Sequence, residues 1–244
     1  MKFQHPIHNK VVQVLETVNS DFLQNCSIAF GGGTMLALAY GEYRLSRDID
    51  FLCPYGEAFS NLRRSIFDRS YEALFNLDEC KTRDISFPRD LRTERDGVHF
   101  AVQNEDTVFK FEIVAEGHIR LDASMQLEWC PVPCLSLVDQ VTEKLLANGD
   151  RWADRSVDSR DLIDLAILRL KTSFPEQALT KAESAYPTVE PLKRSILAFQ
   201  TAPDYRCRCY QRLQIEHPSM IVDGLDLLAA QFELPPFDRE ASER

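Results

Sequence analysis

The feature that most constrains this chain is a run of three glycines that is followed by two alternating aspartates. The glycines at 31–33 follow the short apolar run at 27–30 and precede the apolar segment at 34–40, which has helical composition and is closed by another glycine. The segment DIDFL at 48–52 then alternates acidic and apolar residues, as a strand with one polar face does. This order predicts a strand, a glycine turn, a helix and a second strand near the start of the chain.

The rest of the N-terminal half mixes helical and strand patterns. Apolar residues at helical spacing predict helices over 9–23 and 57–76. Within 98–114, the runs VHFAV and TVFKFEIV have the pattern of a β-hairpin whose turn contains Glu105 and Asp106. We therefore predict an α+β fold in which a mixed β-sheet with flanking helices comes first.

The second half of the chain has helical patterns and almost no strand pattern. We expect this part to be a helical bundle, and we place the domain boundary at the proline-containing stretch WCPVPCLS, which divides the chain into domains 1–135 and 136–244. The role of residues 175–244 beyond stabilising the bundle is not indicated by any motif. The predicted helices cover 136–148, 159–170, 175–186, 188–200 and 220–232.

Composition limits the classes of partner. The net charge is −10 and the pI is near 5.0, so a nucleic-acid partner would need a local basic face. The N-terminus lacks the apolar core of a signal peptide, and no run approaches the roughly 18 to 20 apolar residues that span a bilayer. We therefore expect a cytoplasmic protein with no membrane partner. Candidates for a basic face are Arg63, Arg64, Arg151 and Arg155.

The seven cysteines form an odd set without a C-x-x-C pair, and we expect reduced thiols. Cys207 and Cys209 could in principle bind a metal ion, but ordinary packing is the better explanation of their spacing.

The two aspartates have the arrangement of a metal site. Asp48 and Asp50 lie two apart in a predicted strand, so both carboxylates should project from one face and could bind one hard divalent ion or a pair of ions. Nucleotidyl transfer needs such ligands because Mg²⁺ or Mn²⁺ neutralises triphosphate charge. The alternative is an edge strand with a solvated face.

The glycine turn could hold phosphate next to this metal site. Gly32 and Gly33 end a strand and begin a helix, where free backbone N–H groups favour an anion, and Thr34 adds a hydroxyl donor. Arg47, like Arg44 and Ser46, lies just before the aspartates and could hold phosphate or orient the carboxylates. A glycine triplet alone is more often a tight turn. Followed by D-I-D-F in the next strand, it predicts a phosphate-binding turn beside a metal site.

A third carboxylate is expected from a neighbouring strand. In VFKFEIV, Glu112 shares one face with Lys110, while Phe109, Phe111 and Ile113 share the other. Glu112 is the candidate third metal ligand or general base. The alternative is a solvent-exposed face of lysine and glutamate.

A further charged group lies in the helical half. Lys144 is one helix before Asp161 and Asp164, which are three apart and therefore on one helical face. Their spacing alone slightly favours surface ion pairs that cap two helices.

Together, these stretches resemble a known family. The segment G-G-T-M-L-A-L-A-Y-G-E-Y-R-L-S-R-D-I-D-F is similar to the first motif of the AbiEii/AbiGii toxin-like nucleotidyltransferases, the abortive-infection branch of the polymerase-beta-like superfamily. F-K-F-E-I resembles the family's third-carboxylate strand, and E-K-L-L-A with R-D-L-I-D-L resembles its lysine and aspartate motifs. The resemblance runs from about residue 28 to 170 and implies a nucleotidyltransferase-like fold.

The resemblance also implies roles for individual residues. Gly32, Gly33 and Thr34 would contact the triphosphate of an NTP, and Asp48 and Asp50 would hold Mg²⁺. Lys144 would bind nucleotide phosphate, and Asp161 would help to organise the acceptor or the base.

The resulting hypothesis is a Mg²⁺- or Mn²⁺-dependent enzyme that transfers NMP from an NTP to an acceptor hydroxyl. The family's members are toxin-like components of abortive-infection or type IV toxin–antitoxin modules, which implies a cognate antitoxin, and some transfer nucleotides to tRNA. Two alternatives stay open: a small-molecule nucleotidyltransferase of the antibiotic-modifying type, and a nucleotide-binding partner protein without turnover.

Overall fold

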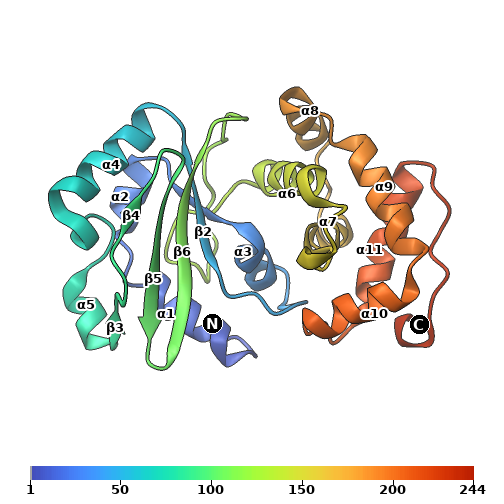
Figure 1. Cartoon of the computed structure of the whole chain (residues 1–244), viewed down its shortest axis with the longest axis horizontal. Coiled ribbons are helices and arrows are strands. Elements are labelled where there is room, and N and C mark those ends of the chain that lie inside the picture. The colour runs from blue at the N-terminus through green and yellow to red at the C-terminus, as the bar shows by residue number, and fades with distance from the viewer. Residues whose placement is uncertain (1) are drawn as a thin grey trace. The chain divides into compact units, whose positions relative to one another are not determined.

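The computed structural model describes residues 2–244, which form two compact units (Figure 1). The first contains residues 2–42 and 46–136, and the second contains Tyr43–Leu45 and Leu137–Arg244. The chain therefore joins the second unit briefly, between the glycine turn and the aspartate strand, before it returns to the first.

The first unit is built around a six-stranded mixed sheet with the order β1-β2-β6-β5-β3, in which β4 also pairs with β5. The β2–β6 pair is parallel, and the other pairs are antiparallel. The predicted hairpin is confirmed, with its two strands joined at Glu105 and Asp106. The strands are β1 (Ala29–Gly31), β2 (Ile49–Pro54), β3 (Ile85–Ser86), β4 (Arg92–Thr93), β5 (Gly97–Asn104) and β6 (Thr107–Glu116).

Helices flank this sheet, as predicted for the α+β class. In Figure 1, α4 and α5 lie on one side of it. The helices of the unit are α1 (Pro6–Leu15), α2 (Ser20–Asn25), α3 (Gly32–Ala39), α4 (Glu57–Arg69) and α5 (Leu77–Thr82), with a 3₁₀ turn η1 (Ser70–Ala73) after α4.

A row of phenylalanines crosses one face of the sheet. Phe30, Phe51, Phe111 and Phe100 come from four adjacent strands, and consecutive ring centroids are 5.4, 5.2 and 4.6 Å apart. Phe75, between η1 and α5, packs edge-on against Phe100 and Phe111. Because successive side chains of a strand alternate between faces, this apolar row directs the neighbouring residues of β2, β6 and β5 to the opposite face.

The second unit contains only helices among its regular elements. The interface between α7 and α11 is tight, because α11 carries Gly224 against the backbone of Ala166. As independently folding domains, 1–135 and 136–244 stay a prediction. The helices are α6 (Leu137–Arg151), η2 (Arg155–Val157), α7 (Arg160–Lys171), α8 (Glu176–Ala185), α9 (Val189–Gln200), α10 (Pro203–Arg212), α11 (Pro218–Gln231) and η3 (Ala241–Glu243).

Two predicted helices are shorter in the structure than expected. The helix expected over 9–23 is split into α1 and α2, since Asn19 N–H donates to the Leu74 carbonyl and Thr17 accepts from Asn76 N–H, both at 2.8 Å. The helix expected over 57–76 ends at Arg69, where Ser70 has a φ of 53°.

The sequence prediction missed α10. Its buried side includes Arg206, which is 1% exposed and donates to the Glu243 carboxylate at 2.8 and 2.9 Å. An arginine at an inward position removes the apolar period on which the prediction of a helix depends. The contact also ties the C-terminal turn η3 to α10, which gives part of 175–244 a structural role.

The sequence predicted reduced thiols and no membrane-spanning segment. All seven cysteines are free, and Cys209 is buried while Cys207 is half-buried. Within residues 2–244, no helix combines the length and apolar character needed to cross a bilayer.

We expect Gly224→Ala to lower the free energy of unfolding by about 1–3 kcal/mol, because an added Cβ would lie 2.1 Å from the Ala166 carbonyl oxygen. Gly149→Ala in α6 is the matched control, since its Cβ would meet Tyr186 at an ordinary 3.4 Å. That change should be neutral or stabilise by up to about 1 kcal/mol. Urea unfolding measures both, and equal effects would contradict the close α7–α11 contact.

Candidate active site

Asp50 and Glu112 lie side by side on neighbouring strands. They are register partners in the parallel pair of β2 and β6. Both are half-buried, and they alternate with Phe51 and Phe111 of the aromatic row, so both project from the opposite face. Asp48 is also half-buried but comes one residue before β2 begins. The structure therefore places Asp50 and Glu112 next to each other by strand register, whereas Asp48 lies just outside the paired strand.

The glycine turn packs directly against this carboxylate pair. Gly31 pairs with Asp50 across the β1–β2 ladder. Gly32 has a φ of 68°, and a Cβ at this residue would lie 2.6 Å from Asp50 Oδ2. Only glycine combines this left-handed conformation with so close an approach. The backbone of the turn and the Asp50 carboxylate are thus immediate neighbours.

The helix that follows presents its N-terminus at this point. Gly32 and Gly33 are the first residues of α3, and Gly31, the N-cap, has no side chain that could accept their N–H groups. Thr34 is fully buried, and its hydroxyl lies 2.9 Å from the hydroxyl of Ser46. The observed contact of Thr34 is therefore with the segment that leads to Asp48. Arg47, in the same segment, is exposed.

Both oxygens of Glu112 are engaged. His99, its register partner on β5, places Nδ1 2.6 Å from Oε1, and Lys110 places Nζ 2.5 Å from Oε2. The prediction that Lys110 and Glu112 share a face is confirmed. Sequence reasoning missed His99, although counting back from the turn at Glu105 and Asp106 places it opposite Glu112.

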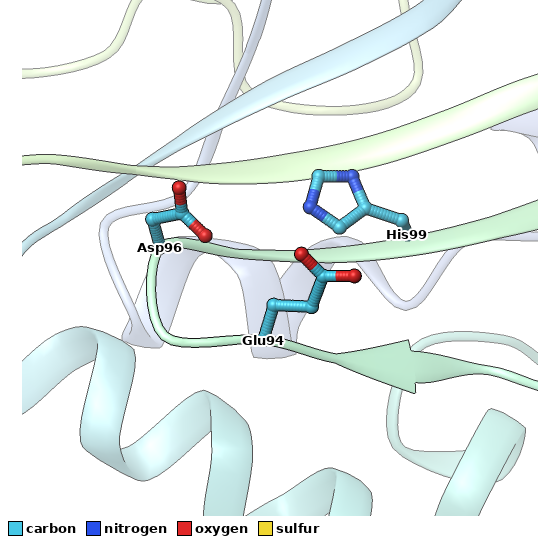
Figure 2. Close-up of side chains that lie close together, drawn as sticks. All are labelled: Glu94, Asp96 and His99. Atoms are coloured by element: carbon cyan, nitrogen blue, oxygen red, sulfur yellow. The ribbon is translucent and has the colours of Figure 1, made fainter.

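Glu94, Asp96 and His99 form a second group with possible ligand atoms. One such atom from each residue lies within 4.8 Å of the others. Figure 2 shows both carboxylates beside the imidazole, on the β4–β5 hairpin. The two acids are exposed and His99 is half-buried. This group adjoins the candidate site through the His99–Glu112 contact.

The remaining predicted charges form a buried cluster within the second unit. Arg44 donates from Nε and Nη2 to the two oxygens of Asp164, at 2.6 and 2.9 Å, and Tyr43 donates to the same carboxylate at 2.7 Å. Lys144 Nζ lies 2.7 Å from the second oxygen of Asp164. Arg44 was expected to hold phosphate or orient the aspartates, and the structure instead engages its guanidinium inside the unit.

Asp161 completes this cluster. Lys144 donates to it at 3.0 Å, and Arg151 donates from Nε and Nη2 at 2.7 and 3.0 Å. Asp161 and Asp164 are 2% and 0% exposed, so their interpretation as surface ion pairs is wrong. The spacing placed both on one face of the helix correctly, but that face points inward.

Burial alone would raise the pKa of both aspartates, yet the neighbouring cations outweigh it. Arg44 and Lys144 hold the pKa of Asp164 below its usual range, and Lys144 and Arg151 do the same for Asp161. The pKa of Lys144 is raised because the two carboxylates outweigh its burial. All of these groups are therefore charged at neutral pH.

We expect Gly32→Ala to destabilise the chain more than Gly41→Ala does. Both residues have positive φ, which by itself disfavours alanine by roughly 1–2 kcal/mol, but Gly41 has no atom within 4 Å of an added Cβ. The difference in unfolding free energy isolates the contact with Asp50. Equal losses would show that the turn does not press on that carboxylate.

We expect Asp164→Asn to lower the free energy of unfolding at pH 7 by about 3–5 kcal/mol, because it leaves buried cations without their partner. Asp78→Asn is the control, since Asp78 is 95% exposed in its pair with Lys81, and it should change stability by less than about 0.5 kcal/mol. Denaturant unfolding measures both variants.

The same cluster predicts a pH dependence. Because Asp161 and Asp164 titrate at lower pH in the folded chain than in the unfolded one, their contribution is present above pH about 4 and is lost as pH falls through the folded pKa. The stability difference between the wild type and Asp164→Asn should therefore shrink as the pH falls below about 4. A constant difference would contradict the lowered pKa.

Three solved structures are similar to this chain over most of its length. A candidate nucleotidyltransferase from Helicobacter pylori aligns over 95% of both chains with 20% identity and a TM-score of 0.49. JHP933 from Helicobacter pylori aligns over 95% of this chain and 93% of its own, with 19% identity and a TM-score of 0.49. An antigenic nucleotidyltransferase-like protein from Paracoccidioides brasiliensis aligns over 85% and 94%, with 12% identity and a TM-score of 0.39.

No curated protein matches the sequence. The family model described as "Nucleotidyl transferase AbiEii toxin, Type IV TA system" matches residues 13–202, which is most of the chain. The chain therefore belongs to the AbiEii family of nucleotidyl transferase toxins of type IV toxin–antitoxin systems, and it is a nucleotidyltransferase.

Proposed function

We propose that this nucleotidyltransferase transfers NMP from an NTP to a hydroxyl of tRNA, with Mg²⁺ or Mn²⁺ held by Asp48, Asp50 and Glu112. The observation that carries the proposal is the register of Asp50 with Glu112 on adjacent strands, directly beside the backbone of Gly32.

These residues fit a hard divalent cation. All three offer carboxylate oxygens, which Mg²⁺ prefers, and Gly32 leaves open the space beside Asp50 that a Cβ would fill. The bound cation would neutralise charge on the triphosphate. The N–H groups of Gly32 and Gly33 at the start of α3 are suited to bind phosphate oxygens next to it.

The chain's own groups would then position an in-line displacement. The acceptor oxygen attacks the α-phosphorus, the bond from that phosphorus to the bridging oxygen breaks, and pyrophosphate leaves. The alternative role for Glu112, in place of metal binding, is that of the general base that takes the hydroxyl proton. Arg47 is exposed and close in sequence to Asp48, so it can pair with a phosphate. The bond between Thr34 and Ser46 would hold the segment before Asp48.

For Lys144 and Asp161 we propose positioning roles in place of the phosphate and acceptor contacts that the family resemblance implies. Lys144 Nζ is engaged by two carboxylates, and Asp161 by two cations. A phosphate contact from Lys144 would have to break a buried ion pair, which is strongly unfavourable. Their proposed role is to hold Arg44, and so the segment that leads to Asp48, in a fixed conformation.

One surface of the first unit supports an RNA acceptor. On α4, Phe67 lies three residues after Arg64 and four after Arg63, so its ring neighbours both arginines, and the three residues line a hollow of about 390 Å³. Phe67 is 89% exposed. An exposed aromatic ring beside two cations suits a stacked base flanked by phosphates. This local face supplies the positive charge that the acidic chain lacks overall.

The family also supports a protein partner. We propose that a cognate antitoxin controls this activity, as expected for a type IV module, and that the protein acts in the cytoplasm, where NTP and tRNA are available.

Incubation with Mg²⁺, each labelled NTP and total tRNA tests the proposal. Wild-type protein should label tRNA, and Asp50→Asn should reduce labelling by at least about 100-fold because a metal ligand is lost. Asp78→Asn, an exposed carboxylate on α5, should retain activity. Full labelling by Asp50→Asn would overturn the assigned site.

The same assay tests the acceptor. Phe67→Ala should raise the tRNA concentration for half-maximal labelling by about tenfold, through the loss of one stacking contact. Release of pyrophosphate without labelled RNA would favour a small-molecule acceptor. Bound nucleotide without pyrophosphate release would favour the binding protein without turnover.

A further inference from the structure

We propose that His99 is a positioning residue for Glu112, and that Gly97 maintains the ring orientation that this requires. The inference deepens the proposed function, on which it rests for the role of Glu112 as a metal ligand or base. Neither His99 nor Gly97 was among the residues that the sequence indicated.

The imidazole of His99 contacts the carboxylate of Glu112 directly. His99 and Glu112 are register partners on antiparallel strands, and Nδ1 lies 2.6 Å from Oε1. Cross-strand partners have their side chains on the same face, so the imidazole and the carboxylate meet without distortion of the ladder. With a proton on Nδ1, the ring donates to Glu112 and limits rotation of the carboxylate.

Of the two residues that contact Glu112, His99 is the less exposed and Lys110 the more exposed. Lys110 contacts the other oxygen, but its side chain is 58% exposed, whereas that of His99 is 31% exposed. A lysine with several free torsions and access to water fixes a partner weakly. A half-buried ring on a paired strand is more rigid, so His99 should dominate the orientation of the carboxylate.

Gly97 lies against the far side of the His99 ring. A Cβ at Gly97 would lie 2.7 Å from His99 Nε2 and 3.0 Å from Cε1. Gly97 has no positive φ, so the backbone does not require glycine here. The glycine leaves room for the ring, which would be the nearest neighbour of a Cβ, ahead of the Ile113 carbonyl oxygen at 3.2 Å. In Figure 2, Nε2, the ring nitrogen farther from the backbone, lies on the side of Glu94 and Asp96. The other ring nitrogen, Nδ1, contacts Glu112.

The arrangement has a known physical consequence. Partners that hydrogen-bond a metal-binding carboxylate or histidine fix its direction, and their removal typically costs about 10–100-fold in metal affinity or activity. His99 should act on the metal through Glu112 without contacting nucleotide. Its loss should therefore weaken metal binding and lower kcat, with little change in KM for NTP.

The test compares His99→Leu with His99→Asn. Asparagine places an amide nitrogen where Nδ1 lies and can still donate to Glu112, whereas leucine cannot. Titration with Mn²⁺, followed by electron paramagnetic resonance, should show at least about tenfold weaker binding for His99→Leu and a change below about threefold for His99→Asn. Lys110→Met, which removes the other contact, is the matched control and should stay close to the wild type.

Gly97→Ala supplies a double-mutant cycle. Alone it should weaken Mn²⁺ binding about as much as His99→Leu, and in the His99→Leu background it should add nothing further, because the two changes act through one contact. Additive losses would show that Gly97 acts independently of the ring. Wild-type affinity in His99→Leu would overturn the positioning role.

A direct observation separates this inference from the proposed function. Nitrogen-15 NMR of labelled histidine should show His99 with its proton on Nδ1, and Glu112→Gln should change that signal. A proton on Nε2 alone would overturn the inference even if tRNA is labelled. A protein that labels no acceptor, yet shows the Nδ1 proton and weaker Mn²⁺ binding in His99→Leu, would remove the proposed function and keep the inference.

Discussion

The candidate site depends on the pairing register of β2, β6 and β5, because successive side chains of each strand point to opposite faces of the sheet. Phe51, Phe111 and Phe100 pack on one face, and this forces Asp50, Glu112 and His99 onto the other. Burial of the aromatic rings is therefore what directs the polar groups. A shift of one residue in either pairing would exchange the two sets, exposing the rings and burying the carboxylates, so the hydrophobic face protects the register on which the chemistry depends.

The glycine turn adds a second constraint that is local. The backbone of Gly32 approaches the Asp50 carboxylate as closely as it does only because there is no Cβ between them. The N–H groups proposed to bind phosphate and the Asp50 oxygens proposed to bind the metal are thereby placed together by two short strands and the start of one helix. This part of the site needs only the short segment from Gly31 to Asp50, whereas Glu112 joins it from β6 through the parallel strand pairing.

In the buried charge cluster of the second unit, the cost of desolvating charges opposes the attraction between them. Arg44, Lys144 and Arg151 face Asp161 and Asp164, so three cations surround two carboxylates. Taking such charges out of water is unfavourable, and the mutual attraction compensates only where hydrogen bonds are nearly complete. A buried cluster of this kind contributes less net stability than an apolar core would, but it tolerates few alternative arrangements. It defines where residues 43–45 lie on the helices of this unit.

Sequence reasoning found the elements whose signal is local. The glycine turn, the aspartate strand, the hairpin and the helical second half were all predicted from residue spacing. It failed where distant groups decide: α1 and α2 are separated by backbone bonds to residues 74–76, and α10 was missed because Arg206 is directed inward by Glu243. The same limit explains Asp161 and Asp164, whose spacing indicated a shared face but not that it is buried.

By itself, the sequence determined the composition of the site and its order along the chain: glycines, then two aspartates, then a glutamate that follows Phe111. These follow from short-range rules, since turn geometry and strand alternation depend on neighbouring residues. Only the tertiary structure decided which side chains meet across strands and helices. His99 contacts Glu112 because the strand register places the two residues opposite each other. Arg44 and Lys144 pair with Asp164 because charges can be buried together only where they neutralise one another.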